Sequence, residues 1–401
     1  RNMRSIMRSY FMLQQLQSYY TQVDVKTIQY ANENGELLDT TQAIMTGALK
    51  LSHLVITYED GTTVIANGST ETDFNITHDG YTLQLPPAGY AGWSGDKKVF
   101  VKSAINNNTH ADYVESPEYI FVDGRDNLFQ RFPKAASAGL AVCRFAPDRK
   151  TAEFIPLEGT ECAFAVNATK AIALAEDLTE LGPAQIRQAR GLTYILPVKN
   201  AFSYKLLIDN SPIPIKLTSE ADFVSPNETV TVKGQQKHTA TSPEDAKNGQ
   251  RIWMQFEGQW IDFTVRNLAE VKTEFDENKL VFTLASNKNY PIDLTLEFQG
   301  NTKSLQLQPK QPSKVEFNFL PDNKPSTQEL TMKINMGKIL QNHTFKFTTM
   351  ERPVVVKPPL TEDFQVATQL DGQAAPQGGL QGSANAMLVS DFTAGTPGAN
   401  T

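Results

Sequence analysis

Hydrophobic residues recur every three or four positions over residues 1–20. The apolar positions are Met3, Ile6, Met7, Tyr10, Leu13, Leu16 and Tyr20. Because an α-helix has 3.6 residues per turn, these side chains would form one stripe along an amphipathic helix, and that stripe needs a partner surface. A second, short helix is predicted over 40–48, where Asp39 can cap the free backbone N–H groups.

From Leu54 onward the period of the apolar residues falls to two, which predicts β-strands. Two hairpins are explicit, because Asp60-Gly61 and Asp79-Gly80 each separate two alternating runs and tolerate the positive φ of a two-residue turn. We expect a first β module over 49–145. Its further strand-like runs are 98–102, 119–122 and 140–145.

Residues 146–264 mix strand and helix signals. A helical stretch is predicted where Pro183 would start a helix and Gly191 would end it. A second β module and an extension of the first module fit this pattern equally well. The strand-like runs are 153–157, 162–166, 192–197 and 203–208.

The clearest module covers 265–350, where seven short segments alternate apolar and polar residues. This pattern is typical of an immunoglobulin-like β-sandwich, without the Cys and Trp markers of antibody domains. The segments are 269–273, 280–284, 292–298, 304–307, 315–320, 329–334 and 343–347. Residues 351–401 begin with a proline-rich run, and we expect a linker followed by a flexible or truncated tail. The fold class predicted for the chain is therefore mainly β, with tandem β-sandwich modules behind an N-terminal amphipathic helix.

A series of short motifs begins within the first predicted helix and continues beyond it. They are Gln14–Gln17, Ile28-Gln29-Tyr30, Val55–Tyr58 with Asp60-Gly61 and Asn67, and Leu85-Pro86-Pro87-Ala88-Gly89-Tyr90. Their order resembles the junction between the last helix of a glycoside hydrolase (β/α)₈ barrel and its C-terminal β domain. The seven-stranded module is similar to the NEW3-like or adhesion-type accessory domains that follow such barrels.

The resemblance implies that the chain is the non-catalytic C-terminal part of a large secreted carbohydrate-active enzyme. Residues 1–48 would then be the end of the barrel, and the catalytic carboxylates would lie upstream of Arg1. The implied location is extracellular, periplasmic or at the cell surface. The implied partners are the upstream catalytic domain and a polysaccharide or other glycan.

The formal charge of -7 is spread along the chain without a basic stripe, so we expect no nucleic-acid partner. No stretch approaches the roughly 20 apolar residues that a membrane span requires. The five histidines lie far apart, and no nucleotide-binding or acyl-transfer motif occurs, so we expect no metal ion and no cofactor.

An acidic group surrounds the Ser116-Pro117 and Gly124 turns and consists of Asp112, Glu115, Glu118, Asp123 and Asp126. Glycoside hydrolysis needs two opposed carboxyl groups, and Ca²⁺ binds carboxylate oxygens, so a catalytic site and a calcium site are both conceivable. A solvated acidic loop explains the same residues. We expect the loop, and we assign no catalytic residue.

Two aromatic pairs are the candidate sugar-binding residues: Tyr90 with Trp93, and Trp253 with Trp260 across a predicted turn at 256–259. Aromatic rings that lie flat against the C–H face of a sugar bind carbohydrate, but large aromatics on alternating strands also build cores.

Two further features leave alternatives open. Cys143 and Cys162 would form a disulfide or remain two buried thiols. Glycosylation sequons begin at Asn67, Asn75, Asn107, Asn167, Asn227 and Asn342, and polar turns explain them equally.

Three functions follow from these observations. The first is an accessory region that supports or targets an upstream glycoside hydrolase domain. The second is a cell-surface adhesive or structural β-sandwich protein without enzymatic activity. The third is an enzyme complete within these residues, which would need a carboxylate or metal cluster formed only on folding.

Overall fold

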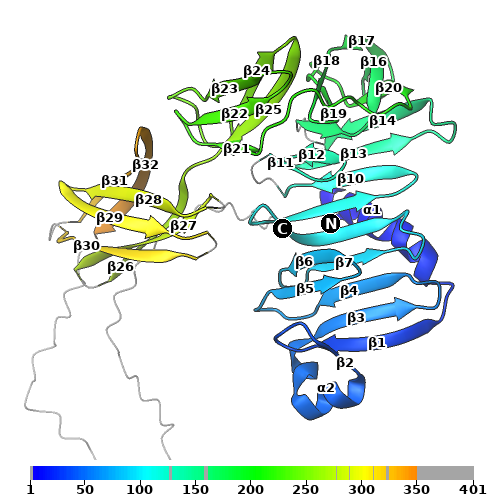
Figure 1. Ribbon diagram of the computed structural model, residues 1–401, viewed down its shortest axis with the longest axis horizontal. Coiled ribbons are helices and arrows are strands. Elements are labelled where there is room, and N and C mark those ends of the chain that lie inside the picture. The colour runs from blue at the N-terminus through cyan, green and yellow to red at the C-terminus, as the bar shows by residue number, and fades with distance from the viewer. Residues whose placement is uncertain are drawn as a thin grey trace, which may run out of the picture. The chain divides into compact units, whose positions relative to one another are not determined.

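A computed structural model describes residues 3–349 except 126–128, 158–160, 277, 289, 310 and 322–324. The expected linker and tail at 351–401 lie outside the described residues. The described part is mainly β, as the alternation of apolar residues predicted (Figure 1). Its helices are α1 (Met3–Tyr20), α2 (Thr40–Thr46) and the 3₁₀ turn η1 (Ala48–Leu51).

The largest element is an antiparallel sheet of thirteen described strands. In spatial order they are β17 (Glu180–Ala184), β16 (Asn167–Leu174), β20 (Ser203–Asp209), β14 (Thr151–Pro156), β13 (Leu140–Phe145), β10 (Tyr119–Asp123), β9 (Thr109–Glu115), β8 (Phe100–Asn106), β7 (Tyr90–Trp93), β4 (Thr63–Asn67), β3 (His53–Tyr58), β1 (Val25–Ala31) and β2 (Leu37–Leu38). The expected boundary near residue 145 falls at the turn between β13 and β14, which pair with each other. The strands after this boundary that join the large sheet therefore extend it.

A five-stranded sheet packs on one face of the large sheet. Its strands, in spatial order, are β11 (Gln130–Arg131), β12 (Ala135–Ser137), β15 (Cys162–Phe164), β19 (Leu192–Ile195) and β18 (Ile186–Ala189). Between the sheets lies an apolar core in which Phe154 meets Phe164 edge to face, with 4.6 Å between the ring centroids. Both cysteines are buried in this core as free thiols, and burial raises the pKa of each thiol.

The hairpin of β5 (Phe74–His78) and β6 (Tyr81–Leu85) covers the same face of the large sheet near β4 and β7. Its Asp79-Gly80 turn has the positive φ angles that the sequence predicted. Two of the motifs on which the family resemblance is based contact each other here. Asn67 donates from Nδ2 to the carbonyls of Leu85 and Pro86, at 2.9 and 3.0 Å, and its backbone N–H donates to Gly89.

Of two short helices predicted from the sequence, one is confirmed and the other is wrong. Helix α2 begins as predicted, since Asp39 accepts from the Gln42 N–H at 2.8 Å and Gly47 ends the helix with φ of 80°. The helix expected between Pro183 and Gly191 is wrong, because β17 and β18 occupy this segment. Pro183 lies in an edge strand, where the missing N–H leaves no ladder hydrogen bond unmade.

A small β body follows the five-stranded sheet. It consists of β21 (Phe223–Val224), β22 (Thr229–Lys233), β23 (Lys237–Thr241), β24 (Arg251–Phe256) and β25 (Gln259–Val265), with its own apolar core.

The seven-stranded immunoglobulin-like sandwich predicted for 265–350 is confirmed. One sheet holds β26 (Ala269–Asp276), β27 (Lys279–Ser286) and β30 (Ser313–Asn318); the other holds β29 (Asn301–Leu307), β28 (Ile292–Phe298), β31 (Ser326–Met336) and β32 (Ile339–Thr349).

Candidate functional site

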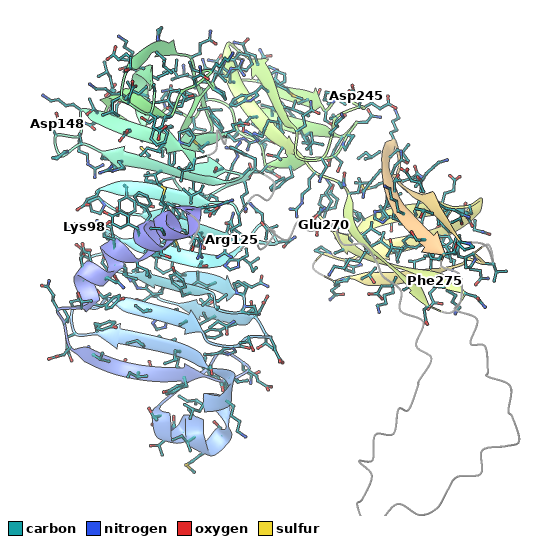
Figure 2. The ribbon with its side chains drawn as sticks, turned by 180° about the vertical axis from the view of Figure 1, so that it is seen from behind. Lys98, Arg125, Asp148, Asp245, Glu270 and Phe275 are labelled. Atoms are coloured by element: carbon teal, nitrogen blue, oxygen red, sulfur yellow. The ribbon has the colours of Figure 1, made fainter. Side chains whose placement is uncertain are left out.

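Helix α1 lies across the face of the large sheet that is opposite to the five-stranded sheet (Figure 2). Phe11, Met12 and Leu16 are buried against the sheet. Phe11 packs edge to face on Tyr119 at 5.0 Å, and the Tyr119 hydroxyl donates to the Phe11 carbonyl at 2.6 Å. A Cβ on Gly92 would lie 2.5 Å from Leu16 Cδ2, so a glycine is needed beneath the helix.

Buried ion pairs fasten α1 to the sheet. Arg8 Nη2 lies 2.9 Å from Asp112 Oδ1, and Arg125 Nη2 lies 3.1 Å from the same oxygen. Arg4 pairs with Asp123 at 2.9 Å. Burial alone would raise the pKa of Asp112, but the hydrogen bonds and charges of Arg8 and Arg125 outweigh it and hold that pKa below its usual value. The carboxylate therefore stays ionised at neutral pH.

The acidic group predicted as a solvated loop is thereby corrected. Asp112 and Asp123 are buried strand residues paired with arginines, whereas Glu118 is exposed and Glu115 is partly exposed. Asp126 lies outside the described residues. Among the described residues no group of three or more His, Cys, Asp or Glu side chains could hold a metal ion.

The outer face of α1 is also apolar. Ile6, Tyr10 and Leu13 are 50%, 55% and 40% exposed. The single stripe expected for this helix is therefore wrong in part, because its members divide between a buried and an exposed face. Met3 carries no described side chain.

Two apolar side chains of the sheet lie on the same side of it as α1. Ile28 on β1 faces Ile56 on β3, and Ile56 faces Val64, which packs against the α1 core. Alternation therefore places Ile28 and Ile56 on the α1 side of the sheet. Ile28 is 44% exposed. We call the set Ile6, Tyr10, Leu13, Ile28 and Ile56 the α1-side surface.

Trp253 and Trp260 come together, as predicted, on the two strands of the β24–β25 hairpin. Its turn at Glu257-Gly258 has the positive φ angles of such a turn. The two rings meet edge to face with 6.3 Å between centroids, and Trp253 also packs on Tyr194 of β19 at 4.7 Å. Both are half-buried within an apolar cluster that the hairpin shares with the five-stranded sheet.

The Arg187 guanidinium lies over both tryptophan rings, 4.4 Å from the Trp260 centroid and 5.2 Å from that of Trp253. This cation occupies ring surface that a sugar would need. The placement favours the alternative in which the two tryptophans are part of a core.

In the second aromatic pair one residue, Trp93, is buried and the other, Tyr90, is partly exposed. Trp93 is fully buried beside Tyr81 and Phe100, and its Nε1–H donates to Asp79 at 3.2 Å. Both faces of the Trp93 ring belong to the core, and a ligand cannot reach them in this structure. Tyr90 is partly exposed, and burial raises the pKa of its hydroxyl to about 12.

A buried charge network around Asp262 fastens the small β body to the five-stranded sheet. Asp262 accepts from Arg131 and Arg251, and from the Tyr194 hydroxyl at 3.0 Å. Arg190 lies 3.7 Å from its other oxygen. Burial would raise the pKa of Asp262, but the arginine charges hold it below its usual value. Nothing in the local sequence indicated this network.

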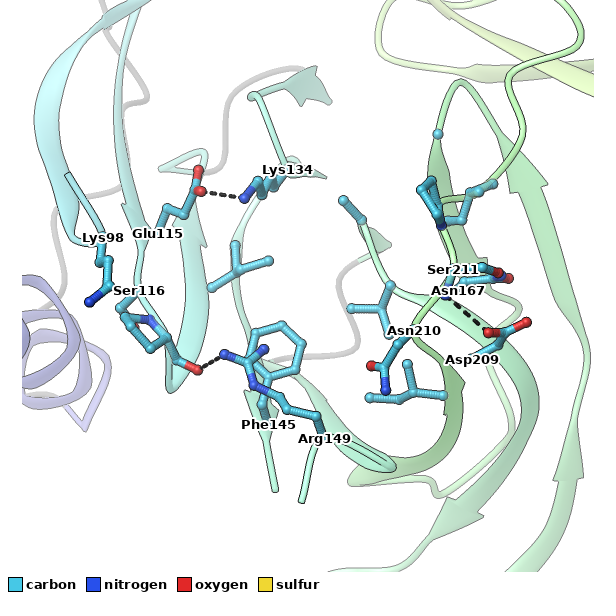
Figure 3. Close-up of a pocket in the computed structure, with 18 of the residues that line it drawn as sticks. Lys98, Glu115, Ser116, Lys134, Phe145, Arg149, Asn167, Asp209, Asn210 and Ser211 are labelled. Carbon is cyan, nitrogen blue, oxygen red and sulfur yellow. Dashed lines mark hydrogen bonds and ion pairs between the residues drawn. The ribbon is translucent and has the colours of Figure 1, made fainter. Parts of the chain in front are cut away.

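A groove of about 700 Å³ opens at one edge of the large sheet. Antiparallel pairing brings the turns β7–β8, β9–β10 and β13–β14 to this edge, together with the segment after β20. Lys98, Lys134 and Arg149 line one side, and Asn167 and Asn210 lie across the groove (Figure 3). The sequence analysis missed this site.

The comparisons with known proteins leave the chain without an assigned family. A scan of protein-family models and a search of curated proteins find no match. Among solved structures the chain is similar to Escherichia coli alpha-2-macroglobulin activated by porcine elastase, with 9% sequence identity and a TM-score of 0.20. The match covers 75% of this chain and 42% of that one.

No helix in the described part of the chain is long and apolar enough to cross a membrane.

Proposed function

We propose that the chain is the non-catalytic C-terminal accessory region of a secreted carbohydrate-active enzyme, where it supports or targets an upstream glycoside hydrolase domain. The observation that carries this proposal is the two-sided packing of α1. One side is buried in the sheet and fixed by Arg8 and Asp112, while Ile6, Tyr10 and Leu13 on the other side remain exposed.

An exposed apolar surface of this kind favours a protein partner. Burial of apolar surface contributes roughly 25 cal/mol per Å², and contiguous apolar patches on soluble proteins commonly mark interaction sites. A domain that docked on the α1-side surface would cover Tyr10, Leu13 and Ile28. Because α1 is fastened to the sheet by buried ion pairs, the docked domain would be coupled rigidly to the β modules.

The fully buried carboxylates of Asp112 and Asp262 do not suit the role of a glycosidase's general acid, whereas burial raises the pKa of the partly exposed Glu161, which pairs with Arg251 at 3.4 Å. A glycosidase's general acid needs a raised pKa, which keeps its proton at neutral pH. Asp112 and Asp262 have lowered pKa values, because arginines surround them. Their carboxylates thus contribute to the fold as permanent anions.

The experiment compares the isolated chain with the longer protein that contains its upstream domain. The double variant Tyr10→Ser with Leu13→Ser should leave the melting temperature of the isolated chain nearly unchanged, because both side chains are exposed. In the longer protein the same variant should separate the unfolding of the two parts in calorimetry. Tyr290→Ser with Leu340→Ser is the matched control, since these side chains are 47% and 46% exposed elsewhere. Equal effects of both double variants in the longer protein would refute the proposal.

A further inference from the structure

We infer that the groove at the sheet edge binds an acidic oligosaccharide, one whose sugars carry carboxylate or sulfate groups. This inference rests on the proposed function for the choice of a glycan as the ligand. The groove's volume of about 700 Å³ lies within the roughly 300–1,000 Å³ typical of ligand clefts. It therefore has room for more than a single small ion.

Arg149 is the anchor for a negative group. It lies on the turn between β13 and β14 and donates from Nη2 to the Pro117 carbonyl, which carries no net charge. Its guanidinium rests 4.2 Å from the centroid of the Phe145 ring. Within the described residues no carboxylate oxygen lies within 4 Å of the Arg149 guanidinium, so no described carboxylate neutralises its positive charge.

The neighbouring lysines differ from Arg149 in this respect. Lys98 pairs with Asp96 at 3.0 Å, and Lys134 pairs with Glu115. Each of these pairs is solvent-exposed in part and is therefore weak and exchangeable. A bound anion would meet Arg149 first, and the lysine ammonium groups would add attraction at the rim.

Polar side chains lie across the groove from Arg149, and one of them, Asp209, carries a carboxylate that accepts from the Ser211 backbone N–H at 3.0 Å (Figure 3). Asn167 donates to Ser211 Oγ at 2.9 Å and accepts from Gln188 at 2.8 Å, so its amide is held in one orientation. Asn210 and Ser211 are exposed beside it. Amides and hydroxyls complement sugar hydroxyls, whereas the planar guanidinium matches carboxylate and sulfate oxygens in a bidentate arrangement. An oligosaccharide whose acidic group meets Arg149 and whose hydroxyls meet Asn210, Ser211 and the Asp209 carboxylate therefore fits the groove better than a bare anion, which Asp209 would repel.

Binding is measured by calorimetry on the purified chain with four probes: trigalacturonic acid, a chondroitin sulfate tetrasaccharide, neutral galactotriose and sodium sulfate. We expect one or both acidic oligosaccharides to bind at least tenfold more tightly than galactotriose and sulfate. Arg149→Gln should weaken that binding at least tenfold. Lys150→Gln removes the same charge from the adjacent position, outside the groove lining, and should change binding less than twofold.

Three results would overturn the inference: equal affinity for galactotriose, equal affinity for sulfate alone, or the same loss in Arg149→Gln and Lys150→Gln. Arg149 is exposed, so its variant should unfold at the wild-type temperature, and a melting curve verifies this. Failure here leaves the accessory role untouched, because that role is tested by the Tyr10 and Leu13 variants in the longer protein.

Discussion

Arg8 on α1 forms an ion pair with the fully buried carboxylate of Asp112 on β9, although the two residues lie 104 positions apart in the sequence. The Asp112 side chain is fully buried, and Arg125 binds it from the sheet side. The pair fixes a helix with two apolar faces onto a sheet that can bury only one of them. Because α1 is held in this way, its exposed apolar face has a fixed position on the protein before any partner binds.

The first prediction concerns the stability that depends on this pair. Asp112→Asn should lower the free energy of unfolding by about 2 kcal/mol, since it removes the anion that two part-buried guanidinium groups bind. Asp96→Asn is the control, because its partner Lys98 is largely exposed, and it should cost less than about 1 kcal/mol. Urea unfolding of both variants gives the comparison. Equal losses would show that Arg8 and Arg125 find other partners.

The second prediction concerns the tryptophans of the β24–β25 hairpin. Trp253→Ala should destabilise the protein by about 3 kcal/mol, because it removes the ring that packs on Tyr194 and that the Arg187 guanidinium covers. Binding to insoluble polysaccharides should follow the folded fraction in thermal melts and pull-down assays. A variant that stays as stable as wild type but loses glycan retention would restore the sugar-platform interpretation of Trp253 and Trp260.

The third prediction is a loss of stability on acidification. Burial lowers the pKa of His53, His343 and His110, and for His110 burial and the Arg125 charge bring it to about 4. Since an unfolded histidine titrates near 6.5, the unfolded chain binds more protons below that pH, and folding stability must fall there. For His110 the loss should extend to about pH 4 and reach on the order of 2 kcal/mol.

His110→Gln is the test of this prediction. The amide can replace the imidazole near Ser103, which lies 2.8 Å from His110 Nε2, but it does not titrate. The unfolding free energy of the variant should therefore change less between pH 7 and pH 4.5 than that of wild type. Parallel pH profiles for the two proteins would assign the acid sensitivity to other groups.

The fourth prediction concerns activity. The purified chain should release no reducing sugar from a panel of plant, algal and bacterial polysaccharides, because Asp112 and Asp262 are held ionised by arginines and Glu161, whose pKa burial raises, is paired with Arg251. Turnover that survives purification and disappears in Asp112→Asn with the fold intact would make the chain an enzyme in its own right.

Alternation of apolar residues was sufficient to predict the seven strands of the immunoglobulin-like module. The alternation is plainest in β28, where Ile292, Leu294 and Leu296 are buried and the residues between them are exposed. The Asp79-Gly80 hairpin and the Asp39 cap are equally local, because turn and cap geometry depend on a few adjacent residues; at Asp60-Gly61 only the glycine has the positive φ that was predicted for both residues.

Features that depend on distant parts of the chain were not predictable in the same way. The sequence of α1 has apolar residues on two faces, and only the sheet decides that Phe11 is buried while Tyr10 is exposed. Asp112 looked like a loop residue because its partner Arg8 comes from another element. The groove around Arg149 is assembled from separate turns, so no motif of adjacent residues marks it.

The most direct test of the account is hydroxyl-radical footprinting of Tyr10, which is 55% exposed. In the isolated chain Tyr10 should react about as fast as Tyr290, which is 47% exposed in another part of the protein. In a longer protein that carries the proposed upstream domain, Tyr10 should be protected at least fivefold while Tyr290 reacts as before. Equal reactivity of Tyr10 in both proteins would contradict the docking of that domain on the α1-side surface.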